Sequence, residues 1–167
     1  MKNIVQNKSI IATYNSKIIS KLKKMADTSE SQRSRAIIHL NRNSKINEMI
    51  IVLKKNSYLR PHSHPNKKTE TYHVIEGRMN VCIFDRYGKI IKVVKMGNIK
   101  SGLEFYYRMN KTIFHMPMAI SNYCVYHEIY SGPFVKNKDV NYCDWSPKEN
   151  EKEKIKIFLK NIRLNNF

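Results

Sequence analysis

The segment covering residues 60–77 holds three of the six histidines in the chain. His62 and His64 are two residues apart, so an extended backbone would direct both imidazoles to the same face. A turn near Pro65-Asn66 would let Glu70, which begins the next expected strand, bring a carboxylate beside that face. Imidazole and carboxylate together suit a first-row divalent metal that keeps one position open. The alternative is a pair of surface histidines in a proline-rich loop.

A fourth ligand has to come from another strand, and His115 is the best-placed candidate. It ends a short run of strand-forming residues, 112–114, directly before Met116-Pro117. A single histidine on an apolar strand is equally consistent with a buried core residue. With this residue included, the sequence predicts a metal site made of His62, His64, Glu70 and His115. Near pH 7 the imidazoles are neutral and the carboxyl is ionised, so the set would be ready to bind metal.

Alternation along the strands selects two further candidates for chemistry. Counting by twos from Glu70 places Tyr72 on the ligand face and His73 on the opposite face. In a later strand Glu128 lies on the face opposite to His127. Glu128 could act as a general base or order a metal-bound water, and Tyr72 could support the metal ligands or contact a substrate. Equally, Glu128 could pair with one of the many lysines and arginines.

Three arginines are candidates for binding an anionic substrate. Arg60 precedes the ligand strand, and its guanidinium could clamp a carboxylate or a phosphate through two hydrogen bonds. Arg33 and Arg35 could add to this site from the N-terminal segment. Arg33 and Arg35 could also be surface charges that need no function.

The spacing of apolar residues predicts a mainly β fold with a short helix near each end. Residues 15–26 carry apolar residues at helical spacing with lysines between them, and a polar break follows at 27–31. Apolar residues then recur at period two in short runs separated by turn signals. The expected strands are 36–40, 48–54, 70–76, 79–84, 89–95, 103–108, 112–115 and 121–130. Many short strands with almost no helix between them are typical of a sandwich or barrel.

A charged C-terminal helix is expected over residues 147–163, opened by Ser146-Pro147. The chain therefore divides into three parts of one structural domain. These are an N-terminal helical and irregular segment over 1–35, a β-barrel over 36–134 and a C-terminal extension over 135–167.

The chain of 167 residues has 31 Lys and Arg against 13 Asp and Glu, so its formal net charge is 31 − 13 = +18. Residues 1–60 hold 13 basic and 3 acidic side chains, a net charge of 13 − 3 = +10. The basic residues are scattered, and no DNA-binding or RNA-binding motif accompanies them. We therefore do not expect nucleic-acid binding, whereas a preference for anionic small molecules stays open.

Cysteine usage and apolar runs indicate the compartment. The three cysteines are an odd number with no CxxC pair, which disfavours a disulfide scaffold and a thiolate zinc site and favours the reducing cytoplasm. The longest apolar run, Met49–Leu53, is too short to cross a bilayer. No apolar stretch of signal-peptide length follows Met1, so we expect neither membrane insertion nor an export signal.

The run His62-x-His64-x5-Glu70-x6-Gly77 resembles the first motif of the cupin superfamily, and His115 stands where the second motif supplies its histidine. Within the cupins the chain is similar to WbuC-type cupin metalloproteins, found among genes for bacterial surface polysaccharide. The pieces that carry this resemblance are 31–35 with His39, 57–62, 84–88, 128–134 and 144–149. The resemblance implies a double-stranded β-helix, a small jelly-roll-like barrel with a divalent metal inside, commonly as a homodimer.

From the ligand cluster and the resemblance we expect a metal-dependent isomerase, epimerase or hydrolase. Its substrate would be a small polar molecule, a sugar or nucleotide-sugar intermediate of surface-polysaccharide biosynthesis that could be phosphorylated. Three imidazoles and one carboxylate suit Zn, Fe, Mn and Ni alike. The alternatives are a non-catalytic, metal-stabilised ligand-binding cupin and a metal-free nucleotide-sugar epimerase that uses a His/Asp base and a Tyr acid.

Overall fold

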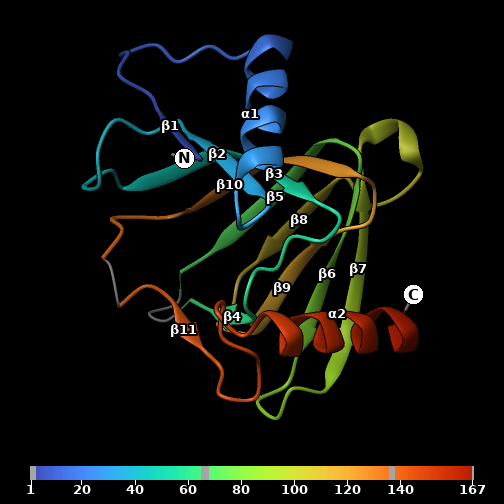
Figure 1. Cartoon of the computed structure of the whole chain (residues 1–167). Coiled ribbons are helices and arrows are strands. Elements are labelled where there is room, and N and C mark those ends of the chain that lie inside the picture. The colour runs from blue at the N-terminus through green and yellow to red at the C-terminus, as the bar shows by residue number, and fades with distance from the viewer. Residues whose placement is uncertain (1–2, 65–67, 136–137, 167) are drawn as a thin grey trace.

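The computed structural model describes residues 3–64, 68–135 and 138–166, and it contains two β-sheets and two α-helices (Figure 1). The first sheet has six strands in the order β1 (Ile4–Gln6), β2 (Arg33–Ile37), β3 (Ile46–Lys54), β10 (Tyr123–Ser131), β5 (Glu70–Glu76) and β8 (Tyr106–Met109). The second has five, in the order β11 (Asn141–Tyr142), β4 (His62–Ser63), β9 (Phe114–Ala119), β6 (Arg78–Phe84) and β7 (Ile90–Gly97). The helices are α1 (Ser16–Thr28) and α2 (Lys152–Asn166), with a short 3-10 helix at Ile99–Ser101.

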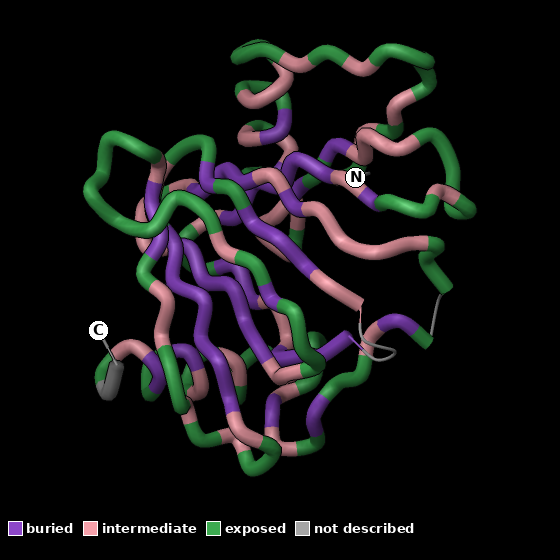
Figure 2. Tube along the Cα trace, turned by 180° about the vertical axis from the view of Figure 1, so that it is seen from behind, coloured by how far each residue is buried: buried purple, intermediate pink, exposed green. Residues whose placement is uncertain are grey.

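The two sheets pack face to face as a jelly-roll-like sandwich, which confirms the predicted fold class. Side chains between the sheets come from alternate positions of the inner strands, as period-two patterning requires. This central core consists of Met49, Ile51, Leu53, Tyr72, Val74, Met79, Val81, Ile83, Met96, Ala119, Cys124 and Tyr126. Figure 2 shows the buried segments gathered on the paired strands, while many of the connecting loops are exposed.

The unbroken apolar run Met49–Leu53 is explained by burial on both faces of β3. Its odd-numbered side chains enter the central core, whereas Ile50 and Val52 lie under α1 against Leu22 and Ala26. On the other side of the molecule, α2 covers the second sheet through a cluster of Tyr58, Cys82, Phe84, Met116, Met118, Leu159 and Ile162. Each helix thus covers the outer face of one sheet (Figure 1).

The predicted elements agree with the structure in type, and several differ in their bounds. The helix expected over 15–26 is α1, and its start is fixed by Asn15, whose side chain accepts a hydrogen bond from the Lys17 amide at 2.9 Å. The strand expected over 36–40 is found at Arg33–Ile37, so the sheet begins before residue 36. The very short strands β1 and β11 were not expected.

The start predicted for the C-terminal helix, residue 147, is wrong, because α2 begins at Lys152. Residues 148–151 form a separate turn. In it the Lys148 amide donates to the Glu151 carboxylate at 2.7 Å and the Glu151 amide donates to the Lys148 carbonyl at 3.0 Å. The turn expected near Pro65-Asn66 lies outside the described residues. None of the helices that the structure describes is long and apolar enough to cross a membrane.

The position that joins β5 to β6, Gly77, requires a glycine because of its backbone conformation and because of the atoms around it. Its φ is 79°, and an added Cβ would lie 2.2 Å from the Tyr123 carbonyl oxygen.

Gly102 has a similar φ of 72° but nothing within 4 Å of its Cβ position, so it is a matched control for substitution of Gly77. We expect Gly102→Ala to cost about 1 kcal/mol and Gly77→Ala at least about 3 kcal/mol of unfolding free energy, measured in urea. Equal losses would contradict the steric explanation.

Candidate metal centre

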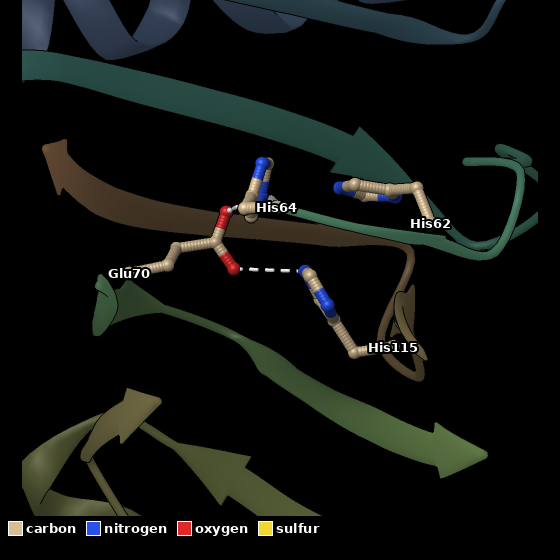
Figure 3. A group of neighbouring side chains, drawn as sticks. All are labelled: His62, His64, Glu70 and His115. Carbon is tan, nitrogen blue, oxygen red and sulfur yellow. Dashed lines mark hydrogen bonds and ion pairs between the residues drawn. The ribbon is translucent and has the colours of Figure 1, made fainter. Parts of the chain in front are cut away.

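Three strands from the two sheets bring the four predicted metal ligands together (Figure 3). His62 lies in β4 and is paired directly with His115 of β9, so their rings stand side by side with centroids 4.4 Å apart. Glu70 is the first residue of β5 in the opposite sheet, and His64 follows β4. The expectation that His62 and His64 lie on one face, with the carboxylate of Glu70 beside that face, agrees with this arrangement.

The four side chains converge on one small volume. One ligand atom from each residue lies within 4.8 Å of the others. Glu70 joins the group through both carboxylate oxygens, because Oε1 lies 3.1 Å from His64 Nε2 and Oε2 lies 2.8 Å from His115 Nε2. His115 is 0% exposed, Glu70 is 2% exposed and His62, the most accessible, is 9% exposed.

Backbone carbonyls fix the orientation of all three imidazoles. The Nδ1 atoms of His62, His64 and His115 lie 2.9, 2.8 and 3.1 Å from the carbonyl oxygens of Arg60, Asp139 and Ile113, respectively. A carbonyl oxygen only accepts, so each Nδ1 carries the proton and donates it. In a neutral ring the Nε2 lone pair is then free to face the centre of the group. Such outer hydrogen bonds are the usual support of metal-bound histidines.

Two atoms of the group are close together without being hydrogen bonded. His115 Nε2 and Glu70 Oε2 are 2.8 Å apart, yet neither has an aligned hydrogen-bond partner within residues 3–64, 68–135 and 138–166. Buried polar atoms without partners are costly, and each one requires an explanation. A lone pair on nitrogen and a carboxylate oxygen that face the same space are both satisfied by a cation. The residues present therefore fit a divalent metal.

Burial and the neighbouring charges explain the pKa values of His62, His64 and Glu70. Burial would raise the pKa of Glu70, but the neighbouring His115 and His64 hold it well below its usual range. Burial, followed by the influence of His115, lowers the pKa of His62 to about 3, so this ring is neutral at pH 7. Burial would also lower the pKa of His64, but its hydrogen bond to Glu70 and the charge of that carboxylate raise it to about 9. Without a metal, the charge of Glu70 is therefore compensated by its histidine neighbours, His115 and His64.

A cavity of about 380 Å³ leads to the group and is lined by His62, His64 and Glu70. All the other residues selected from the sequence also line it, namely Arg33, Arg35, Arg60, Tyr72 and Glu128. His115 lies beneath these residues, fully buried. The structure therefore gathers every predicted site residue around one centre.

Glu128 and Tyr72 point into the sandwich from paired positions of β10 and β5. Glu128 is 8% exposed, and its carboxyl forms no ion pair in the described parts of the chain. The alternative of a Glu128 carboxylate paired with a lysine or arginine is therefore not found there. Burial, followed by the negative charge of Glu70, raises the pKa of Glu128 to about 8. Burial likewise keeps the pKa of Tyr72 well above 10. Both groups hold their protons at neutral pH.

The guanidinium groups of the three arginines differ in the hydrogen bonds and ion pairs that they already make. Arg60 donates to the Ser146 hydroxyl at 3.1 Å and to the Cys143 carbonyl at 2.6 Å, and it lies over the ring of Tyr142. Arg33 donates to the Tyr58 carbonyl at 2.7 Å and pairs with Glu149 at 2.8 Å. Both tie the C-terminal extension to the sandwich. Arg35 is exposed and makes no ion pair among the residues described, so its guanidinium is available to a ligand.

Sequence reasoning missed Asp139, whose backbone carbonyl orients His64. Its carboxylate accepts from the Val135 amide at 2.6 Å and pairs with Lys68 at 2.7 Å, which fixes the loop that supplies this carbonyl. A backbone carbonyl leaves no trace in the residue type. The only available signal was the lone acidic residue between Lys138 and Val140.

Comparisons with known proteins agree with the architecture. A family model described as a domain of unknown function (DUF6016) matches residues 14–96, and no curated protein matches the chain. A recombinant oxalate oxidase in complex with glycolate is similar in structure, with a TM-score of 0.51 at 11% identity over 69% of this chain and 57% of that one. At this identity the likeness shows the fold alone. The chain has the cupin fold.

Two other solved structures are similar at lower scores. The Cnp3 cupin domain of Schizosaccharomyces pombe has a TM-score of 0.47 at 7% identity, over 61% of this chain and 66% of that one. A DMSP lyase has a TM-score of 0.49 at 9% identity, over 68% of this chain and 53% of that one. The match spans less than two thirds of the length of each of these structures.

Replacing Lys68, the cation that pairs with Asp139, should destabilise the segment whose Asp139 carbonyl orients His64. Burial would raise the pKa of Asp139, but the hydrogen bond from Lys68 holds it below its usual value. A lowered pKa stabilises the fold above the unfolded pKa, and this stability is lost as the pH falls through the folded value. We expect Lys68→Met to cost about 3 kcal/mol of unfolding free energy at pH 7. The cost should shrink towards zero near pH 2, and a constant cost would contradict this assignment.

The raised pKa of Glu128 predicts that its contribution to stability falls as the pH rises, opposite to the contribution of Asp139. Between the unfolded value of 4.5 and about 8 the folded state keeps a proton that the unfolded state has released. The stability of the metal-free protein should therefore fall as the pH rises through this window, by up to about 1.4 kcal/mol per pH unit from this group. Glu128→Gln should remove that slope. An unchanged slope in urea unfolding of the variant would show that Glu128 is ionised in the fold.

Proposed function

We propose that this protein is a metal-binding cupin that holds one divalent transition metal through His62, His64, Glu70 and His115. The observation that carries the proposal is the convergence of three carbonyl-oriented imidazoles on one buried carboxylate. Zn, Fe, Mn and Ni are the candidates that this ligand set suits. When bound, such an ion polarises a carbonyl or hydroxyl group, or activates water.

The residues around the centre have distinct roles in this proposal. His62, the most exposed ligand, lies on the cavity side, from which a substrate would arrive. Glu128 lines the cavity, and its carboxyl group, whose pKa is raised in the metal-free protein, can exchange a proton with a substrate oxygen. Arg35 attracts an anionic group to the cavity, and Arg33 and Arg60 keep its wall in place. Tyr72 packs against Tyr126 with ring centroids 5.0 Å apart and closes the inner end.

The substrate class in this proposal comes from the resemblance to WbuC-type cupins. It is a small sugar or nucleotide-sugar intermediate of bacterial surface-polysaccharide biosynthesis, converted by isomerisation, epimerisation or hydrolysis. The cavity of about 380 Å³ lies within the range of small-molecule sites and supports a ligand of this size. The proposal includes a homodimer, as the resemblance implies.

A second candidate is a non-catalytic cupin in which the metal stabilises the sandwich around a bound ligand. One observation favours it. Glu70 belongs to the first sheet and His62 and His115 belong to the second, so an ion bound by all three would join the two sheets directly. Such an ion would raise the stability of the fold by mass action. A bound metal that leaves no position for water or substrate would favour this function over the enzyme.

Metal content tests the proposal directly. We expect the purified protein to carry about one transition-metal ion per chain by elemental analysis, because four ligands converge on one site. His115→Ala and Glu70→Gln should each lower metal affinity at least about tenfold. The same substitutions should remove the rise in unfolding temperature that the added metal produces.

His73→Ala is the matched control, because this histidine lies three residues after Glu70 on the same strand but faces outwards. It should leave the metal content and the metal-induced rise in unfolding temperature unchanged. A wild-type protein that binds no metal, or a control that loses it equally, would contradict the proposal.

A further inference from the structure

A second and larger cavity, of about 1190 Å³, lies beside α2. We call it the basic groove. It runs between one face of the helix and the loop at residues 29–33, with Tyr58 between them. Its side on the helix is formed by Lys152, Ile155, Lys156, Leu159, Lys160, Arg163 and Leu164. Their spacing of three and four residues places them on one face along three turns of the helix.

The groove has an excess of positive charge. Its lining includes five basic side chains and two acidic ones, and both acidic groups are already paired. Glu149 pairs with Arg33 at 2.8 Å, and Glu30 pairs with Lys152 at 2.7 Å. Of the three remaining cations, Lys156 pairs with Glu153 at 2.7 Å and Arg163 donates to the Lys55 carbonyl at 2.5 Å. Lys160 has no ion pair in the part of the chain that the structure describes.

The groove and the cavity of the metal centre share a wall. Arg33 and Glu149 line both of them, together with Asn3 and Ser31. The ion pair between Arg33 and Glu149 therefore stands at the boundary of the two spaces. We call the two neighbouring cavities together the extended site; three of the proposed metal ligands line one of them and lysines of α2 line the other.

We infer that the basic groove binds the phosphate of a phosphorylated organic ligand whose other end reaches the metal centre. This inference rests on the proposed function and assigns a chemical class to its substrate. Lysine ammonium groups bind phosphate as point charges, and a groove with low-dielectric walls strengthens their attraction. The apolar side chains of Tyr58, Ile155 and Leu159 offer a surface for the uncharged part of the ligand.

This inference assigns a place in the fold to some of the basic residues that are scattered along the sequence. Lys152, Lys156 and Lys160 recur every four residues, and this is the period that builds one basic stripe on a helix. The apolar pattern of the same helix predicts only how it packs on the second sheet. The partner loop, at residues 29–33, lies more than a hundred residues earlier in the chain, so sequence alone does not place the two sides together.

Binding of glucose 1-phosphate, followed by phosphorus NMR and calorimetry at low salt, tests the inference. We expect the double variant Lys156→Glu/Lys160→Glu to weaken binding at least about fivefold, since two phosphate-facing charges are reversed. Lys154→Glu is the matched control for the single reversal Lys160→Glu, because Lys154 is on the same helix but outside the groove. The control should change affinity less than about twofold, the scale of an indirect charge effect.

The extended site is tested with the protein loaded with Mn²⁺. The paramagnetic ion should enhance the relaxation of the bound phosphorus nucleus, and the lysine double variant should abolish this enhancement. The metal content of every variant is measured in parallel, so that failure of the metal site is seen separately. Binding to the groove without any enhancement would contradict a ligand that reaches the metal centre.

Three other outcomes would overturn the inference. If His62→Ala abolishes phosphate binding and the lysine variant does not, the phosphate is held by the metal alone. If Lys154→Glu weakens binding as much as Lys160→Glu does, the attraction is a general effect of net charge. If a single-stranded RNA binds far more tightly than the sugar phosphate and loses affinity with either variant, the surface is a nucleic-acid site.

Discussion

The structure of this protein depends on how one buried negative charge, the carboxylate of Glu70, is neutralised. Removing an ion of this size from water costs several kcal/mol unless a partner compensates it. Three imidazoles surround the carboxylate, and without a metal the neighbouring His115 and His64 compensate its charge, with the pKa of His64 raised to about 9. That arrangement leaves Glu70 Oε2 and His115 Nε2 in contact without a hydrogen bond. A divalent cation satisfies all four groups at once, which is why we place a metal here.

The rest of the molecule maintains this geometry. The ligands come from both sheets, so the packing of the central core sets the distance between Glu70 and the histidines. The C-terminal extension contributes the Asp139 carbonyl that orients His64, and Arg60 and Arg33 tie this extension to the sandwich. The same extension ends in α2, whose basic face forms the groove next to the metal cavity. The proposed metal site and the inferred ligand groove therefore both depend on one C-terminal segment.

Local patterns were sufficient to predict most of the longer strands, the fold class and the four converging side chains. Period-two alternation correctly placed Tyr72 and Glu128 inward and His73 outward, because that period is a property of each strand alone. What failed depends on contacts between distant residues. The pairing of Arg33 with Glu149 spans 116 positions, so the sequence alone does not show this contact of an arginine that we expected to bind substrate. The start of α2 was misplaced because Glu151 forms a turn with Lys148 before the helix. The support of His64 by Asp139 uses a backbone atom, which no residue pattern reveals.

The most direct test of the central claim is X-ray absorption spectroscopy at the edge of the metal that copurifies with the protein. The account predicts a first shell of nitrogen and oxygen atoms at about 2.0–2.2 Å, with the outer-shell scattering of three imidazoles and with no sulfur. The imidazole signal should decrease by one third in His115→Ala, where a metal still binds, and stay unchanged in His73→Ala. A shell made of oxygen alone, or one that contains sulfur from Cys82, Cys124 or Cys143, would contradict the assignment of His62, His64, Glu70 and His115 as the metal centre.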